Sequence, residues 1–222
     1  MKKKGIIIGG IAAIVVIGII ASFSANQSEN EILNLDMTRT HGTVSTAMGS
    51  PILGSPEAKV TIIEFGDYQC HQCYNWFHNT KPAIVENYIE TGKVNLVFVD
   101  LAFLGRDSPK AAAAAYCAEE QGQYWAYHDL LYVSQEGIDD GWANSERLQA
   151  FAFSLGLDMD LFENCIDSGK FNKRVQFNIN EAKKQGASGT PTFVIVNSNG
   201  QQQKLVGAQP FSVFKNVLDS LI

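Results

Sequence analysis

The sequence predicts an α/β fold in which a β-α-β half and a β-β-α half share one central sheet, with a helical insertion between the two halves. Three observations lead to this prediction. Strand patterns at residues 60–65 and 94–99 flank a helical pattern, every signal from 108 to about 186 is helical, and strand patterns return over 192–206 before an amphipathic helix. With 222 residues, 45% of them hydrophobic and 18% charged, the chain fits one globular domain with an insertion.

The first residues predict export from the cytoplasm. Lysines at positions 2 to 4 precede an uncharged run over residues 5–23 that is rich in Ile, Val, Ala and Gly. As a helix this run would be about 28 Å long, close to the hydrocarbon thickness of a bilayer. We expect residues 1–24 to be a signal anchor, with a cleaved signal peptide as the alternative, because Ser22-Phe23-Ser24 is a weak cleavage motif. The rest of the chain then lies outside the cytoplasm, either held at the cell membrane by a single span or secreted or periplasmic.

Composition separates a tether from the folded part. Residues 25–50 are rich in Asn, Ser, Thr and Gly with isolated apolar residues, which is typical of a tether, and we expect the folded domain over 51–222. The formal net charge is −6, and no basic patch is visible beyond the first residues. This charge argues against nucleic acid as a partner.

The first half of the predicted fold places a helix directly after a strand. The β-branched and aromatic run at 60–65 ends at Gly66-Asp67, which supplies a turn. Apolar residues then recur at helical spacing, so we expect one helix from about Cys70 to Thr91, kinked at Pro82. The strand at 94–99 should lie parallel to the first strand.

Local signals divide the insertion into helices and define the second half. The helices of the insertion are predicted by Ser108-Pro109, by the aromatic run Tyr124 to Tyr132, by caps at Asn144 and Asp158, and by a long pattern from Lys170 to Gln185. The second half consists of a strand at 192–196, a turn at 197–200, a strand at 203–206 and a helix with Pro210 at its first position.

Two cysteines lie at the predicted transition from strand to helix, in the sequence Cys70-His71-Gln72-Cys73. The start of the helix presents unpaired backbone N–H groups and the positive end of its dipole to Cys70, which favours a nucleophilic thiolate. Cys73, one turn further on, can close a reversible disulfide with it. The alternative, half of a structural zinc site, needs two further ligands, and no second C-x-x-C motif or suitably spaced histidine pair follows.

Four stretches carry a resemblance to a known family. They are Glu64 to Cys73 with the pattern E-F-x-D-Y-x-C-x-x-C, Gly54 to Ala58, Cys117 to Trp125, and Gly189 to Phe193. Over about residues 51–222 the chain resembles the DsbA-like thiol-disulfide oxidoreductases, which have a thioredoxin-like fold with a helical insertion. The resemblance implies a dithiol-disulfide exchange enzyme whose active-site disulfide, Cys70-Cys73, is its only redox group, without a metal or a separate cofactor.

The resemblance also implies roles for residues around the dithiol. Thr190-Pro191 matches the cis-proline loop of the family, whose backbone pairs with a substrate strand. Glu64 matches a buried acid that takes and returns the proton of Cys73; the alternative is a strand glutamate facing solvent. The dipeptide between the cysteines, His71-Gln72, departs from the Pro-His that family oxidases often carry, so a strongly oxidising potential does not follow from it.

The remaining cysteines and histidines are assigned from the sequence alone. In an exported protein Cys117 and Cys165 are expected to form a structural disulfide, with two buried free thiols as the alternative. The histidines at 41, 78 and 128 lack the spacing of a metal site, so we expect surface or packing roles for them.

The expected function is disulfide formation in exported polypeptides that carry free thiols, by a monomer that a membrane redox partner reoxidises. Two alternatives stay open at this point. One is a disulfide reductase or isomerase, and the other is a peptide-binding or chaperone module that does not use its thiols.

Overall fold

The computed structural model describes residues 38–222. The predictions for the signal segment at 1–24, and for the tether up to residue 37, lie outside the described residues. Within residues 38–222, no helix is both long and apolar enough to span a bilayer.

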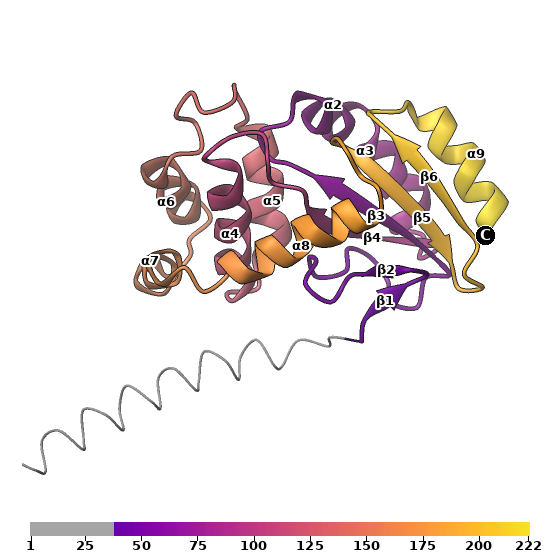
Figure 1. Ribbon diagram of the computed structural model, residues 1–222, viewed down its shortest axis with the longest axis horizontal. Coiled ribbons are helices and arrows are strands. Elements are labelled where there is room, and N and C mark those ends of the chain that lie inside the picture. The colour runs from indigo at the N-terminus through magenta and orange to yellow at the C-terminus, as the bar shows by residue number, and fades with distance from the viewer. Residues whose placement is uncertain (1–37) are drawn as a thin grey trace, which may run out of the picture. The chain divides into compact units, whose positions relative to one another are not determined.

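Four strands form the central sheet in the order β4-β3-β5-β6 (Figure 1). Their bounds are β3 (Val60–Gly66), β4 (Val94–Asp100), β5 (Thr192–Asn197) and β6 (Gln202–Val206). β3 and β4 are parallel, whereas β5 is antiparallel to both β3 and β6. The β-α-β half therefore meets the β-β-α half between β3 and β5, which confirms the predicted fold class.

The two faces of the sheet are covered by different helices, and side chains alternate between them along β3. Ile63 and Phe65 belong to the larger core cluster, which includes α4, α5 and α8. Val60 and Ile62 belong to a second cluster with residues of α2, α3 and α9 (Phe211–Leu221). By the same alternation Glu64 is on the side of Val60 and Ile62. Pro210 precedes α9 as its N-cap rather than as its first helical residue.

The helix after β3 is broken, and the prediction of one helix over 70–91 was wrong. The structure has α2 (His71–Asn79), α3 (Lys81–Ile84) and the π-helix η1 (Val85–Ile89). Pro82 lacks a backbone N–H and its ring crowds the preceding turn, which favours the break at Thr80. The Thr80 hydroxyl donates to the carbonyl of Gln209, which ties the break to the segment before α9.

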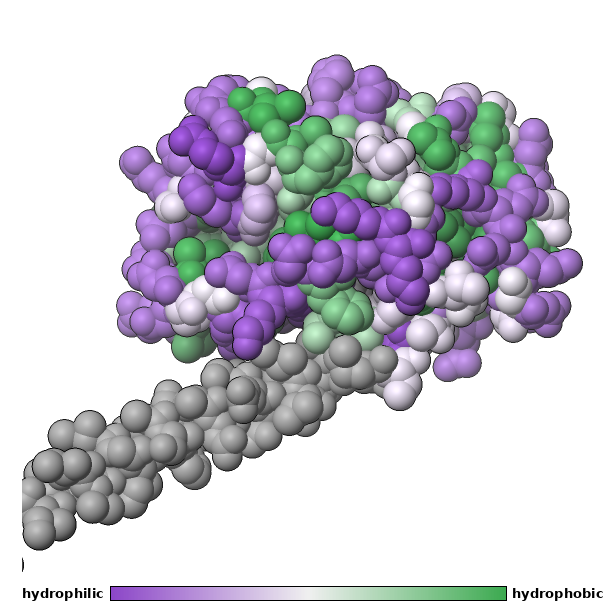
Figure 2. Space-filling view, viewed as in Figure 1, coloured by the Kyte–Doolittle hydropathy of each residue, from purple (hydrophilic) through white to green (hydrophobic). Residues whose placement is uncertain are grey.

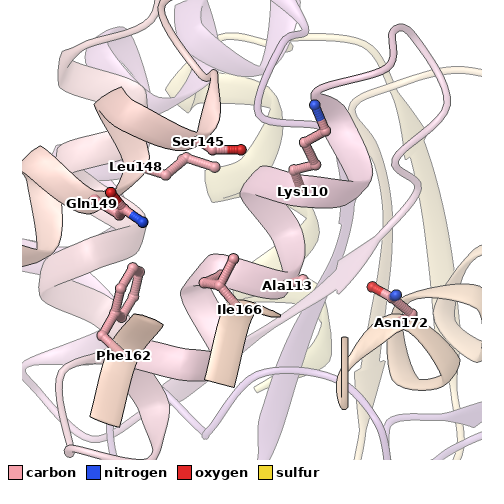
Figure 3. Close-up of a pocket in the computed structure, with 8 residues that line it drawn as sticks. All are labelled: Lys110, Ala113, Ser145, Leu148, Gln149, Phe162, Ile166 and Asn172. Carbon is pink, nitrogen blue, oxygen red and sulfur yellow. The ribbon is translucent and has the colours of Figure 1, made fainter. Parts of the chain in front are cut away.

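The insertion consists of the helices α4 (Ser108–Glu119), α5 (Tyr124–Val133), α6 (Ser145–Ser154), α7 (Met159–Ser168) and α8 (Asn172–Lys184). Both predicted caps are present: Asn144 accepts from the N–H of Arg147, and Asp158 from that of Leu161. In Figure 1 α4 to α7 gather beyond one end of the sheet while α8 crosses in front of it, and Figure 2 shows that the outer face of α8 is polar. A pocket of about 240 Å³ is lined by residues of α4, α6 and α7 and by Asn172, the first residue of α8. Figure 3 shows how these residues lie around it.

The folded part reaches further toward the N-terminus than residue 51, so the tether prediction was wrong for residues 40–50. A two-stranded hairpin, β1 (Thr40–His41) and β2 (Val44–Ser45), comes first, and residues 46–50 are buried. Ser50 donates its N–H to the carbonyl of Phe98 and accepts the Phe98 N–H on its hydroxyl. The segment thereby covers the free edge of β4, which would otherwise leave backbone groups unpaired.

Cys117 and Cys165 are joined by a disulfide, with 5.8 Å between their Cα atoms, that links α4 to α7. The bond closes a loop across 48 positions of sequence.

Replacing both Cys117 and Cys165 by alanine should lower the free energy of unfolding by about 4 kcal/mol, because the unfolded chain regains the entropy of the loop that the disulfide closes. Urea unfolding of the oxidised protein and of the double variant measures the difference. Recovery of both thiols in alkylated form from the native, unreduced protein would contradict the pairing.

Candidate active site

Cys70 is the N-cap residue of α2, which begins at His71, one position after the predicted helix start. Its thiol donates to the carbonyl oxygen of Thr190 at 3.2 Å and is 7% exposed. The thiol makes no capping hydrogen bond. The thiolate, in contrast, is an acceptor, and hydrogen bonding from Cys73 lowers the pKa of Cys70 to about 6, aided by the Thr190 side chain and the N–H groups of Cys73 and Gln72.

Cys73 lies one turn further along α2 and is fully buried. Burial raises its pKa well above the usual value, and the sulfur of Cys70 raises it further. Both cysteines are free thiols in this structure. The structure therefore differentiates them into a more acidic thiol at the helix N-terminus and a recessed thiol that keeps its proton.

Alkylation of the reduced protein should distinguish the two thiols. Cys70 is expected to react with iodoacetamide with a midpoint near pH 6, because the thiolate is the reactive form. Cys73 should stay unmodified through neutral pH, since its pKa is raised and its side chain is buried. Mass spectrometry of peptides across a pH series gives both midpoints. Equal reactivity of the two cysteines would contradict the assignment.

Glu64 is 1% exposed in the middle of β3, so the solvent-facing alternative is wrong. Neither of its carboxyl oxygens has a hydrogen-bond partner among the described residues. Burial raises the pKa of this carboxyl to about 8. The positive charge of Lys81 opposes this effect and lowers the pKa, whereas Cys70 raises it further. Glu64 in turn raises the pKa of Cys73, which places the carboxyl within electrostatic reach of the recessed thiol.

The Thr190-Pro191 bond is cis and immediately precedes β5. The Thr190 carbonyl accepts from Cys70, and its buried hydroxyl oxygen has no partner among the described residues. That hydroxyl can donate once Cys70 becomes a thiolate. The loop is anchored on its other side, where the Gly207 N–H donates to the carbonyl of Pro191.

Two glutamines that the sequence did not single out fasten the helical insertion to the cysteine loop. Gln69 donates from its amide to Asp139 at 3.2 Å and accepts the Asp139 N–H at 2.7 Å. Gln135 donates to the carbonyl of Cys70 at 3.2 Å and to that of Tyr68. Asp139 has a left-handed φ of 53°, so the loop between α5 and α6 adopts a strained turn to make these bonds.

An aromatic cluster backs the site. His128 is fully buried and its Nδ1 lies 2.9 Å from the hydroxyl of Tyr68, so the expected packing role fits. Burial lowers the pKa of His128 well below its ordinary value, which leaves the ring neutral. Of the active-site dipeptide, His71 and Gln72 are both exposed, and the His71 ring stacks on Tyr74.

No group of three or more His, Cys, Asp or Glu side chains within residues 38–222 is arranged to hold a metal ion. The dithiol of the site can exchange disulfides by attack of a thiolate on sulfur, and the buried carboxyl can accept or donate a proton in that exchange.

Comparisons with known proteins agree with this geometry. A family profile described as Thioredoxin matches residues 46–218. A probable disulfide bond formation protein D of Bacillus anthracis is 32% identical over 151 residues, which cover 66% of this chain and 69% of the relative. The corresponding Bacillus cereus protein is 28% identical and covers 87% of each chain. The crystal structure of Wolbachia pipientis α-DsbA1 has a TM-score of 0.67 at 29% identity, covering 77% of this chain and 89% of that one.

The profile match thus covers nearly the whole described chain, including the four-stranded sheet, the helical insertion and the cis-proline loop beside Cys70. The chain belongs to the DsbA-like thiol-disulfide oxidoreductases of the thioredoxin family.

Proposed function

We propose that this protein is an oxidase that introduces disulfides into exported polypeptides through the Cys70-Cys73 pair. The observation that carries the proposal is the different placement of the two thiols: Cys70 is the N-cap of α2, with its sulfur 3.2 Å from the Thr190 carbonyl oxygen, whereas Cys73 is fully buried one turn further on. Hydrogen bonding lowers the pKa of Cys70 to about 6, and burial raises that of Cys73. Stabilisation of the Cys70 thiolate lowers the free energy of the reduced enzyme relative to the oxidised enzyme. This difference favours transfer of the disulfide from the enzyme to the substrate.

The proposed reaction begins with the oxidised enzyme. A substrate thiolate attacks the sulfur of Cys70, the Cys70-Cys73 bond breaks, and Cys73 leaves as a thiolate that takes a proton from Glu64. A second substrate thiolate then attacks the substrate sulfur of the mixed disulfide and releases the Cys70 thiolate. The substrate has lost two electrons and gained a disulfide, while the enzyme is left as the dithiol.

Two features support the role of the residues beside Cys70. The Thr190 carbonyl faces the Cys70 sulfur, so a substrate strand paired with this loop would bring its own sulfur to the same place. His71 and Gln72 are exposed beside it and are positioned to contact the substrate.

Location and partners follow from the sequence and from the relatives. The relatives are called disulfide bond formation proteins, and the lysine-flanked apolar segment at residues 5–23 would hold the domain at the outer face of the cell membrane. A disulfide-bearing membrane partner would accept the two electrons of the reduced pair and restore the oxidised enzyme.

A direct assay tests the proposal. The oxidised protein is mixed with a reduced, unfolded substrate in the absence of other oxidants, and substrate thiols and enzyme thiols are counted over time. One substrate disulfide should form for each enzyme disulfide lost. A protein that leaves the reduced substrate unchanged but reduces the native disulfides of insulin when supplied with a dithiol would instead be a reductase.

A further inference from the structure

Lys81 is a buried cation at the edge of the aromatic cluster behind the site. Glu64 pairs with Phe98 in the sheet register, the Phe98 ring contacts that of His128, and His128 in turn contacts the two rings that Lys81 lies against, Phe77 and Trp125. Its side chain is 7% exposed, and its ammonium group lies 2.7 Å from Asp129 of α5 and 4.5 Å from the centre of the Phe77 ring. The Trp125 ring lies on another side, with its centre 5.5 Å away. Lysine seldom occupies such a position without a partner, and its partner here, Asp129, is 52% exposed.

The break in the helix explains how a lysine comes to lie here. α2 ends at Asn79, and Lys81 is the first residue of α3, directly before Pro82. A single pair between a buried ammonium and a half-exposed carboxylate repays little of the cost of removing the lysine from water. Stability alone therefore gives no reason for a charge at this position.

A groove whose lining does not include the cysteine loop borders this ion pair. Lys81 and Asp129 line a groove of about 440 Å³ between α5 on one side and α2, α3 and η1 on the other. Cys70, Thr190 and Pro191 are not among the residues that line it.

The charge of Lys81 reaches the two buried titratable groups on its inner side. It lowers the pKa of Glu64 and that of His128. The other titratable groups within electrostatic reach of Glu64 are the two thiols of the site and two phenols with raised pKa values: Cys70, Cys73, Tyr68 and Tyr132. None of these four groups carries a positive charge, so Lys81 is the cation that favours the carboxylate.

We propose that Lys81 is a positioning residue for the step in which Cys73 attacks, because its ammonium group, fixed by Asp129, keeps Glu64 available as the carboxylate that accepts the Cys73 proton. The inference rests on the proposed function. In this step Cys70 is bonded to a partner sulfur and carries no charge. The Cys73 proton passes to Glu64, the Cys73 sulfur bonds to Cys70, and the partner sulfur leaves as a thiolate.

The experiment follows the lifetime of one mixed disulfide. Reduced protein is mixed with oxidised glutathione, samples are quenched in acid from pH 5 to pH 9, and mass spectrometry measures how fast the Cys70-glutathione adduct becomes the Cys70-Cys73 disulfide. In Lys81→Met the midpoint of this rate should rise by about one pH unit, the smaller end of what a nearby charge does to a carboxyl. Below the midpoint the resolving rate should fall about tenfold.

Three further variants isolate the charge. Lys81→Arg should keep the wild-type midpoint. Lys110→Met, which removes an exposed lysine of α4 that pairs with Asp107, should change nothing and is the control for loss of a lysine elsewhere. Asp129→Asn leaves Lys81 charged without its competing partner, so the midpoint should fall; this variant loses only a half-exposed carboxylate and tests the proposal even if Lys81→Met does not fold.

A double variant tests whether Lys81 acts through Glu64. In a Glu64→Gln background, Lys81→Met should have no further effect on the rate or its midpoint. An unchanged midpoint in Lys81→Met, an equal shift in the presence and absence of Glu64, or a rise in Asp129→Asn would overturn the inference. Failure of the proposed function looks different, because the wild-type protein itself would then form no adduct or never resolve it.

Discussion

Cys73→Ala is expected to accumulate covalent adducts with exported polypeptides, while Cys70→Ala accumulates none and both lose all oxidase turnover. The first variant keeps the acidic thiol at the start of α2 and loses the group that resolves the adduct. The second keeps only a fully buried thiol whose pKa is raised, so it can neither reach nor attack a substrate.

Gel electrophoresis of membrane and extracytoplasmic fractions, without reductant, separates these outcomes. Adducts of the Cys73→Ala protein should disappear on reduction, and a variant that lacks both cysteines serves as the control. Equal adduct yields from the two single variants would contradict the assignment of roles. Absence of adducts from both would favour the peptide-binding module that does not use its thiols.

Glu64→Leu is expected to make the protein more stable and the resolving step slower. The pKa of Glu64 is about 8 in the folded protein, whereas its ordinary value is 4.5. Between pH 4.5 and pH 8 the protein therefore takes up a proton when it folds, and the carboxyl increasingly destabilises the folded state as the pH rises through this range. At pH 7 the leucine variant should gain about 3 kcal/mol, and below pH 4.5 this gain should disappear. Loss of the proton acceptor should slow the attack of Cys73 about 100-fold at pH 7.

Urea unfolding of the reduced proteins at pH 4 and pH 7 measures the first effect, and the lifetime of the glutathione adduct measures the second. Thr61→Val, a change at another buried polar residue of β3, is a suitable control for repacking the strand. A gain in stability that is the same at both pH values would mean that the carboxyl does not titrate abnormally.

The sequence predicted most of the site because its chemistry lies in short motifs. A carboxylate inside the apolar run of β3 indicated a buried acid, and C-x-x-C after a turn indicated a thiol at a helix start. The cis-proline loop and the roles of Glu64 came from the resemblance, since most bonds before proline are trans. These residues could be predicted without knowing which distant parts of the chain meet, because each one is positioned by the strand or helix end to which it belongs.

Residues that act through tertiary contacts were missed for a physical reason. From the sequence, Lys81 would be expected to be a solvent-exposed residue on a helix. Its side chain points inward because α2 breaks at Thr80. Its neighbour Pro82 was recognised as a kink, which was the one available signal.

The N-terminal boundary was missed because polar residues suggested a tether. Residues 46–50 are held in place by hydrogen bonds that two arginines donate to their carbonyls. Arg174, which is distant in sequence, donates to Met48 and Gly49, and the nearby Arg39 donates to Thr46 and Ser50. Gly49 also allows a close approach to β4, where a Cβ would lie 2.9 Å from the Val97 side chain. Composition does not report such backbone pairing.

The equilibrium of the Cys70-Cys73 pair with glutathione decides whether the protein can act as an oxidase. The wild-type protein is equilibrated in buffers of graded glutathione and glutathione disulfide at pH 7, quenched in acid, and its oxidised fraction is measured by mass spectrometry. Because the Cys70 thiolate is stabilised only in the reduced enzyme, we expect the pair to stay largely reduced until glutathione disulfide is in excess, which marks a couple more oxidising than glutathione. A pair that is fully oxidised in a large excess of reduced glutathione would be a reducing couple and would contradict the assignment as an oxidase.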